Sequence, residues 1–165
     1  MSGQGSILIV DDEPDIGTML AEALRPHGYK VDIALHAGDA VMLASLERPD
    51  AVILDLMLPE ISGEQIFQQL RDLDRSIAIV LLTGMADETV ARALLGAGAF
   101  DYLRKPPDFA RLHAAVALAV AAGREHSRPG TVVPFYSQRR TRPADLGNEA
   151  PDTVRTEFLR QPYRQ

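Results

Sequence analysis

The sequence contains no cysteine, and it has no apolar run long enough to cross a membrane. Without cysteine the chain can form neither a disulfide nor a zinc–thiolate site, and a reducing cytoplasm is its simplest location. The longest apolar stretch, residues 114–122, is far shorter than the ~20 residues that a membrane helix needs. The first residues, MSGQGS, are polar and lack the apolar core of a signal peptide. These absences predict a cytoplasmic protein that does not enter a membrane.

Positive charge is also scarce. The formal net charge of the 165 residues is −6, which argues against non-specific binding to DNA or RNA. Before Glu125 the chain has 18 acidic and 10 basic residues, whereas from Glu125 onward 7 arginines outnumber 5 acidic residues. The chain therefore divides into an acidic body and a mildly basic tail, residues 125–165.

The tail leaves little room for a second domain. Proline and glycine interrupt every candidate element in it, and its length is below that of a typical domain. Two interpretations stay open. The tail is either a disordered linker or a segment whose apolar run, residues 131–136, adds a strand to a sheet edge of the same or a neighbouring chain. A helix near residues 152–160 is also compatible with the pattern.

The body alternates regularly between strand and helix patterns. Five apolar runs have the length of strands: residues 7–10, 31–35, 51–56, 77–82 and 99–103. The continuous runs are rich in Val, Ile and Leu, as in strands that are covered on both faces. After each run apolar residues recur at helical spacing, as at Ile16, Leu20 and Leu24. The pattern predicts an α/β fold with a doubly wound parallel sheet and helices on both faces.

Acidic, hydroxyl and amino side chains stand at or just after the ends of four of these strands: Asp11, Asp12, Asp55, Thr83 and Lys105. Ligands of such sheets bind outside the carboxyl ends of the strands. Adjacent carboxylates repel by roughly 4 kcal/mol at ~4 Å and an effective dielectric constant of ~20. A carboxylate inside the run AVILDLML is also costly to bury without a partner. A divalent cation such as Mg²⁺ would reverse the repulsion, and the lysine and threonine would bind phosphate oxygens.

Four motifs of the body resemble the receiver domain of two-component response regulators: ILIVDDEPD, VILDLMLPEISG, VLLTG and GAFDYLRKPPD. They occur together, in the family's order and at its spacing, and the resemblance covers residues 6–124. It implies a flavodoxin-like (βα)5 sheet with the strand order 2-1-3-4-5. It also implies a signalling module that accepts a phosphoryl group, rather than an enzyme that turns over a substrate.

The resemblance assigns the chemistry to particular residues. Asp55 corresponds to the phosphoacceptor, which attacks the phosphohistidine of a sensor histidine kinase or a histidine phosphotransfer protein. Asp11 and Asp12 correspond to the acidic pair that holds Mg²⁺ together with Asp55 and the backbone carbonyl of Met57. Catalysis of such a transfer consists mainly of positioning and charge neutralisation.

The resemblance also implies a response to phosphorylation. Lys105 would pair with Asp55 and then with a phosphoryl oxygen, and the Lys105–Pro106 bond is cis in this family. Thr83 and Tyr102 correspond to the switch residues, which move when the acceptor is phosphorylated. Output would pass through an unknown downstream protein or a phosphorelay rather than through DNA, and a second copy of the chain is a further candidate partner.

Two methionines stand at positions that tune the hydrolysis of the acyl phosphate in this family. Met57 lies two residues after Asp55, and Met85 lies two residues after Thr83. Thioethers cannot orient an attacking water and would shield the phosphoryl group. We therefore expect slow self-dephosphorylation.

Other interpretations of these residues stay open. Asp12 taken alone would be an ordinary cap of the following helix. A phosphorylation-independent interaction module would have the same fold. A phosphatase of the haloacid dehalogenase type uses similar side chains, but it needs an acid two residues after its nucleophile, where this chain has Met57. The four histidines have no ligand spacing and are expected to be solvated or packed: His27, His36, His113 and His126.

Overall fold

The computed structural model describes residues 3–127, so the predicted segments at 131–136 and 152–160 lie outside the described residues. The strands are β1 (Gly5–Val10), β2 (Tyr29–Ala34), β3 (Ala51–Asp55), β4 (Ala78–Thr83) and β5 (Asp101–Arg104). The helices are α1 (Pro14–Leu24), α2 (Ala37–Glu47), α3 (Gly63–Leu73), α4 (Glu88–Gly96) and α5 (Phe109–His126), with short 3₁₀ helices η1 (Arg25–His27) and η2 (Met85–Asp87). The five predicted strands are confirmed, with ends that differ by no more than two residues.

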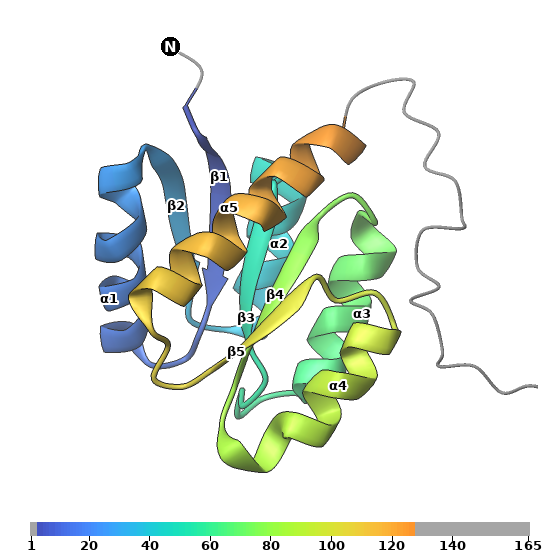
Figure 1. Cartoon of the computed structure of the whole chain (residues 1–165). Coiled ribbons are helices and arrows are strands. Elements are labelled where there is room, and N and C mark those ends of the chain that lie inside the picture. The colour runs from blue at the N-terminus through green and yellow to red at the C-terminus, as the bar shows by residue number, and fades with distance from the viewer. Residues whose placement is uncertain (1–2, 128–165) are drawn as a thin grey trace, which may run out of the picture. The chain divides into compact units, whose positions relative to one another are not determined.

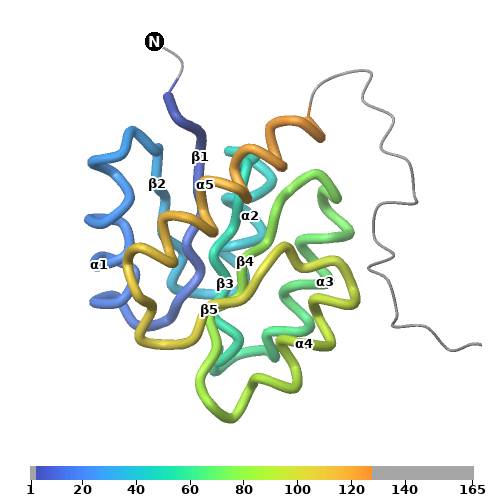
Figure 2. Tube along the Cα trace, in the orientation of Figure 1, coloured from blue at the N-terminus to red at the C-terminus, as the bar shows by residue number. Residues whose placement is uncertain are grey.

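The five strands form one parallel sheet with the order β2-β1-β3-β4-β5. Helices α1 and α5 cover one face of this sheet, and α2, α3 and α4 cover the other (Figure 1, Figure 2). The chain leaves β1 toward one edge and returns to β3 on the other side, so the strand order reverses between β1 and β3. The predicted doubly wound fold is confirmed, and its ligand-binding position lies between these two strands.

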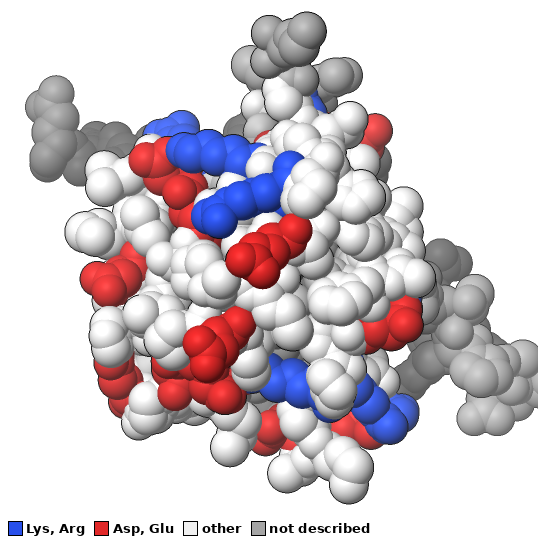
Figure 3. Space-filling view, turned by 90° about the vertical axis from the view of Figure 1, so that its left-hand side faces the viewer, with Lys and Arg blue, Asp and Glu red and all other residues white. Residues whose placement is uncertain are grey.

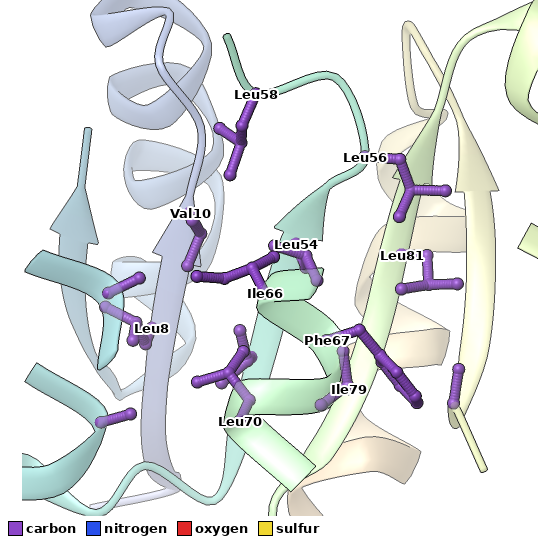
Figure 4. Packing of buried hydrophobic residues seen from close by; sticks show 14 of the residues in the cluster. Leu8, Val10, Leu54, Leu56, Leu58, Ile66, Phe67, Leu70, Ile79 and Leu81 are labelled. Atoms are coloured by element: carbon purple, nitrogen blue, oxygen red, sulfur yellow. The ribbon is translucent and has the colours of Figure 1, made fainter. Parts of the chain in front are cut away.

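Each face of the sheet has its own hydrophobic core. On one face Leu54 of β3 packs with Ile66 of α3, as Figure 4 shows. On the other face Ile53 of β3 belongs to a cluster with Val116 of α5. Every residue of β3 and β4 is buried, which explains why these strands are apolar except at their last residues, Asp55 and Thr83. Each fully buried aliphatic side chain contributes ~1.5–3 kcal/mol to the stability of the fold, so the two cores together fix the positions of the strand ends.

The strand register brings four carboxyl ends to one edge of the sheet. Val10 of β1 pairs with Leu54 of β3, and the next residue, Asp55, pairs with Leu82 of β4. Thr83 of β4 pairs with Arg104 of β5. The carboxyl ends of these strands therefore lie together at the lower end of the sheet in Figure 1.

Helix α3 packs directly against the segment that follows β3. The helix begins at a capping box, in which the Ser62 hydroxyl accepts the Gln65 N–H and the Gln65 side chain accepts the Ser62 N–H. At the next residue, Gly63, an added Cβ would lie 2.6 Å from the Cα of Leu56. Only glycine allows this approach, which fixes the position of the segment immediately after Asp55.

Helix α5 carries apolar side chains on more than one of its faces. Its buried side lies on the sheet, and an added Cβ at Gly123 would lie 2.0 Å from the carbonyl oxygen of Asp50. Leu118 on the same helix is largely exposed, so the described residues do not cover all of its apolar surface. Among the described residues no helix has the length and apolarity that crossing a bilayer requires.

Candidate functional site

Asp55, the last residue of β3, places a carboxyl group in the core at the end of the sheet. Only 2% of the residue is exposed. The Nζ atom of Lys105 lies 2.8 Å from Oδ2 of Asp55, and the backbone N–H of Met57 donates to Oδ1 over 2.9 Å. A buried carboxylate needs such partners, because removing it from water unpaired costs several kcal/mol.

Asp11 is the second buried acid of the site. It follows β1 and is fully buried. Its Oδ2 lies 3.0 Å from Nζ of Lys105, and its Oδ1 accepts the N–H of Glu13 over 2.9 Å. Burial raises the pKa of Asp11, and the negative charge of Asp55 adds to this effect, against the two hydrogen bonds that lower the pKa. Burial and the nearby charge of Asp55 therefore disfavour the ionised form of Asp11.

Lys105 joins the two buried acids. Its backbone N–H donates to the carbonyl of Thr83 over 2.8 Å, which holds the residue at the end of β5. Burial lowers the pKa of its ammonium group, but the hydrogen bonds to Asp55 and Asp11 outweigh burial and raise the pKa above that of ordinary lysine. Lys105 is thus charged at neutral pH. The Lys105–Pro106 bond is cis, as the family resemblance implied.

Three carboxyl groups meet where the strand order reverses. Asp11, Asp12 and Asp55 each offer an oxygen, and these oxygens all lie within 4.8 Å of one another. With the three acids ionised and Lys105 as the paired ammonium, two negative charges remain in excess. Oxygen ligands and a double negative charge are what a hard divalent cation requires. The residues therefore fit a divalent metal, which would also stabilise the ionised form of Asp11.

Thr83 ends β4 beside this cluster. The residue is fully buried, and its Oγ1 has no hydrogen-bond partner among the described residues. A buried hydroxyl without a partner is costly and rare in native proteins. Tyr102 of β5 is only half-buried and packs against the cluster formed with α2, α3 and α4. It also lines a cavity of about 410 Å³ at the edge strand.

Asp12 does not cap the first helix, so that alternative is wrong. The N-cap residue of α1 is Glu13, whose side chain makes no capping bond, and Pro14 occupies the first helical turn. Asp11 accepts the N–H of Glu13 instead. Asp12 is left half-buried and turned to the acid cluster, where its carboxylate can hold a cation.

A cavity of about 560 Å³ opens next to the acid cluster. Asp12 and Met57 line it on one side, and Asp87 and Val90 line it on the side of α4. Met57 is 62% exposed, and Met85, at the start of η2, is 90% exposed. The site is therefore reachable from solvent between the two loops that carry these methionines.

Two contacts were not foreseen from the sequence. Lys105 holds Asp11 as well as Asp55, although 94 residues separate it from Asp11. Glu60 accepts a hydrogen bond from Nδ1 of His36 over 2.7 Å. The motifs signal each residue separately, but no local pattern signals which long-range pairs form.

Comparison with known proteins agrees with this geometry. Residues 7–117 match the family described as the response regulator receiver domain. Response regulator MprA of Mycolicibacterium vanbaalenii is 39% identical over 100 residues, which are 61% of this chain and 43% of MprA. "Probable transcriptional regulatory protein TcrX" of Mycobacterium tuberculosis is 38% identical over 101 residues, which are 61% of this chain and 43% of TcrX. The chain spans less than half the length of these curated relatives.

Solved structures show the same fold. A response regulator receiver domain protein from Clostridium thermocellum aligns with a TM-score of 0.70 and 28% identity, covering 73% of this chain and 98% of that protein. A CheY-like receiver domain protein from Methanospirillum hungatei aligns with a TM-score of 0.68 and 26% identity, covering 73% of this chain and 97% of that protein. The family match, which extends over more than half of the sequence, and the doubly wound sheet lead to one conclusion. The chain belongs to the family of response regulator receiver domains, the phosphoacceptor signalling modules of two-component systems.

Proposed function

We propose that Asp55 accepts a phosphoryl group from the phosphohistidine of a sensor histidine kinase or a histidine phosphotransfer protein. The observation that carries the proposal is the pairing of this buried carboxylate with Lys105 over 2.8 Å, within a cluster of three acids. A structural ion pair does not need two further acids beside it. A phosphoryl acceptor does, because the acids can hold a divalent cation that neutralises the negative charge of the incoming group.

In the transfer, an oxygen of Asp55 attacks phosphorus in line with the bond to the imidazole nitrogen. The new bond joins the carboxylate oxygen to phosphorus, the N–P bond breaks, and the partner's imidazole leaves. Lys105 keeps Asp55 oriented before the attack and, once the acceptor oxygen is esterified, its ammonium is free to bind a phosphoryl oxygen. The Met57 N–H holds the other carboxylate oxygen in place.

The metal proposed for the acid cluster is Mg²⁺. Asp11, Asp12, Asp55 and the backbone carbonyl of Met57 would hold it. When bound, Mg²⁺ supplies positive charge for the acids and the phosphoryl oxygens. The hardness of the carboxylate ligands and the cluster's excess negative charge support this choice.

The phosphoryl group is proposed to act on the fold through Thr83 and Tyr102. The hydroxyl of Thr83, which has no partner within residues 3–127, would donate to a phosphoryl oxygen and so gain a hydrogen bond. Such a contact favours one conformation only by the difference in its free energy between two states, typically a few kcal/mol. Tyr102, half-buried on the neighbouring strand, is the side chain proposed to follow this movement.

The output is proposed to be a protein contact rather than binding to DNA. Acidic side chains outnumber basic ones on the face formed by α1 and β2, which Figure 3 shows, and this charge repels a phosphate backbone. The name of TcrX describes a transcriptional regulator, but the matched residues are less than half of that protein. A second copy of this chain is a further proposed partner. Because the phosphoryl group of histidine kinases comes from ATP, the proposed location is the cytoplasm.

The phosphorylated state is proposed to decay slowly. Met57 and Met85 occupy the two positions that, by the resemblance to receiver domains, tune the hydrolysis of the acyl phosphate by orienting water. Neither thioether can do so. The same Met57 leaves a phosphatase of the haloacid dehalogenase type without its general acid.

One assay separates the proposal from the alternatives. The protein is incubated with Mg²⁺ and acetyl phosphate, and its intact mass is measured. The proposal predicts an adduct of one phosphoryl group that is absent in Asp55→Asn and persists well beyond seconds. Turnover of many phosphate esters would instead support a phosphatase, and the absence of any adduct would support a phosphorylation-independent interaction module.

A further inference from the structure

The two methionines nearest the acceptor are exposed on the loops that flank it. Met57 is 62% exposed and lies two residues after Asp55, and Met85 is 90% exposed and lies two residues after Thr83. Methionine is among the residue types most often buried. Neither side chain has a place in the two hydrophobic cores of the described residues. Packing therefore does not explain why thioethers stand at these two positions.

The fold holds both methionines at the same edge. Strands β3 and β4 pair directly, and the N–H of Leu56 donates to the carbonyl of Leu82 over 3.1 Å, so their outgoing loops start side by side. Met57 is fixed further by its own N–H, which donates to Oδ1 of Asp55 over 2.9 Å. Its side chain lines the cavity of about 560 Å³ together with Asp12. An oxidant in solvent can therefore reach the side chain of Met57, whose backbone N–H contacts the acceptor.

We propose that Met57, with Met85 as a second position, is an oxidation site through which a peroxide shortens the lifetime of the phosphorylated state. The proposal rests on the proposed phosphorylation of Asp55. In the oxidation, the sulfur lone pair attacks one oxygen of hydrogen peroxide, the O–O bond breaks, and an S–O bond forms. Sulfur loses two electrons, the peroxide is reduced, and water is released.

Oxidation converts the thioether of Met57 into a sulfoxide, whose oxygen is a strong hydrogen-bond acceptor. A thioether is a weak acceptor, whereas a sulfoxide is polar. The sulfoxide oxygen at Met57 accepts a hydrogen bond from a water and directs that water at phosphorus. The water oxygen bonds to phosphorus, the bond from phosphorus to the Asp55 oxygen breaks, and the carboxylate, inorganic phosphate and a proton are released. Because the sulfoxide orients the water without removing its proton, the acceleration is about tenfold, below the ~10²–10⁴ of a general base.

The first measurement is a map of oxidation, and it does not depend on phosphorylation. The full chain is treated with hydrogen peroxide, and the sulfoxide at each methionine is followed by peptide mass spectrometry. Met42, which is 52% exposed, and Met19, which is 37% exposed, are internal references. Met57 and Met85 are expected to oxidise at least as fast as Met42 and faster than Met19. Oxidation of Met57 more slowly than Met19 would overturn the proposal.

The second measurement is the lifetime of the phosphoryl adduct. Oxidised and untreated protein are phosphorylated with acetyl phosphate and Mg²⁺, freed of the donor and followed by intact mass. The adduct of the oxidised protein is expected to decay about tenfold faster, and methionine sulfoxide reductases are expected to restore the slow decay. Peroxide should not change the decay in the double variant Met57→Leu, Met85→Leu, whereas Met42→Leu should respond as the native chain does.

The outcomes separate this proposal from the proposed function. An adduct whose lifetime is the same before and after oxidation overturns the oxidation site alone. An equal acceleration in the double variant also overturns it, because the effect then comes from another residue. If the untreated protein forms no adduct, the proposed function fails, and the oxidation site fails with it.

Discussion

The Nζ atom of Lys105 lies 2.8 Å from Oδ2 of Asp55, and the same atom lies 3.0 Å from Oδ2 of Asp11. One ammonium group thus holds two buried carboxylates, which come from β3 and from the end of β1. In the described part of the chain, Lys105 is the cation paired with both acids, so it stabilises the fold as well as the proposed chemistry.

Replacing Lys105 should therefore destabilise the metal-free protein. Lys105→Met leaves two buried acids without a cation, and we expect a loss of about 2–3 kcal/mol in the free energy of unfolding. Protonation of Asp11, whose pKa is already raised by burial, limits the loss. Urea unfolding measures the effect. Lys30→Met is the control, because Lys30 is exposed and pairs with Glu47 at the surface, and its loss should change little. Equal losses in the two variants would contradict this account of the site.

Mg²⁺ should stabilise the protein through the acid cluster. A ligand that binds only the folded state adds about 1.4 kcal/mol at a free concentration of ~10 Kd. We expect the midpoint of thermal unfolding to rise with Mg²⁺ in the native chain and to lose this response in Asp12→Asn. Asp15→Asn, which changes an exposed acid outside the cluster, is the matched control and should keep it. A response that survives in Asp12→Asn would place the ion elsewhere.

The glycine that begins α3 should not tolerate a side chain. In Gly63→Ala the new Cβ would stand 2.6 Å from the Cα of Leu56, so the helix or the segment after Asp55 must shift. We expect a loss of about 1–3 kcal/mol, together with slower phosphorylation. At Gly38 in α2 an added Cβ meets no atom within 4 Å, so Gly38→Ala should stabilise by up to about 1 kcal/mol. Denaturant unfolding of both variants measures the two changes in the free energy of unfolding. Changes of the same sign in the two variants would contradict this prediction.

The ring of His113 lies 4.0 Å from the ring of His27, measured between centroids. Burial lowers the pKa of His113 below the ordinary histidine value of 6.5, and the charge on His27 lowers it further. The folded state therefore prefers neutral His113, so this residue's contribution to stability is present above pH 6.5 and is lost as the pH falls toward its lowered pKa. An NMR titration should show a pKa below 6.5 that rises in His27→Gln. An unchanged pKa in that variant would rule out the coupling.

Much of the fold could be predicted because its signals are local. The run that became β4 is apolar up to Thr83, and the run that became β3 is apolar except at Asp55, because both faces of these strands are covered. Asp55 stands out because it interrupts such a run. The ends of β1, β2 and β5 differed by up to two residues from the prediction. At a strand end the tertiary pairing, rather than the apolar pattern, decides where the ladder stops.

The remaining features depend on contacts between distant residues. That Lys105 spans two acids, that Thr83 has a hydroxyl without a described partner, and that Glu60 meets His36 all follow from how loops pack together. The alternative that Asp12 caps the first helix is wrong because Pro14 starts the helix, which leaves Glu13 as the N-cap. The pattern of residue types along the chain does not show which distant residues come into contact or at which residue a helix begins.

Locating the phosphoryl group on the chain tests the central claim most directly. After reaction with acetyl phosphate and Mg²⁺, borohydride reduces an acyl phosphate to the alcohol, so that a modified aspartate is read as homoserine by tandem mass spectrometry. The account predicts homoserine at residue 55 only, and none when the phosphodonor is omitted. Homoserine at residue 11 or 12, or its absence throughout the chain, would contradict it.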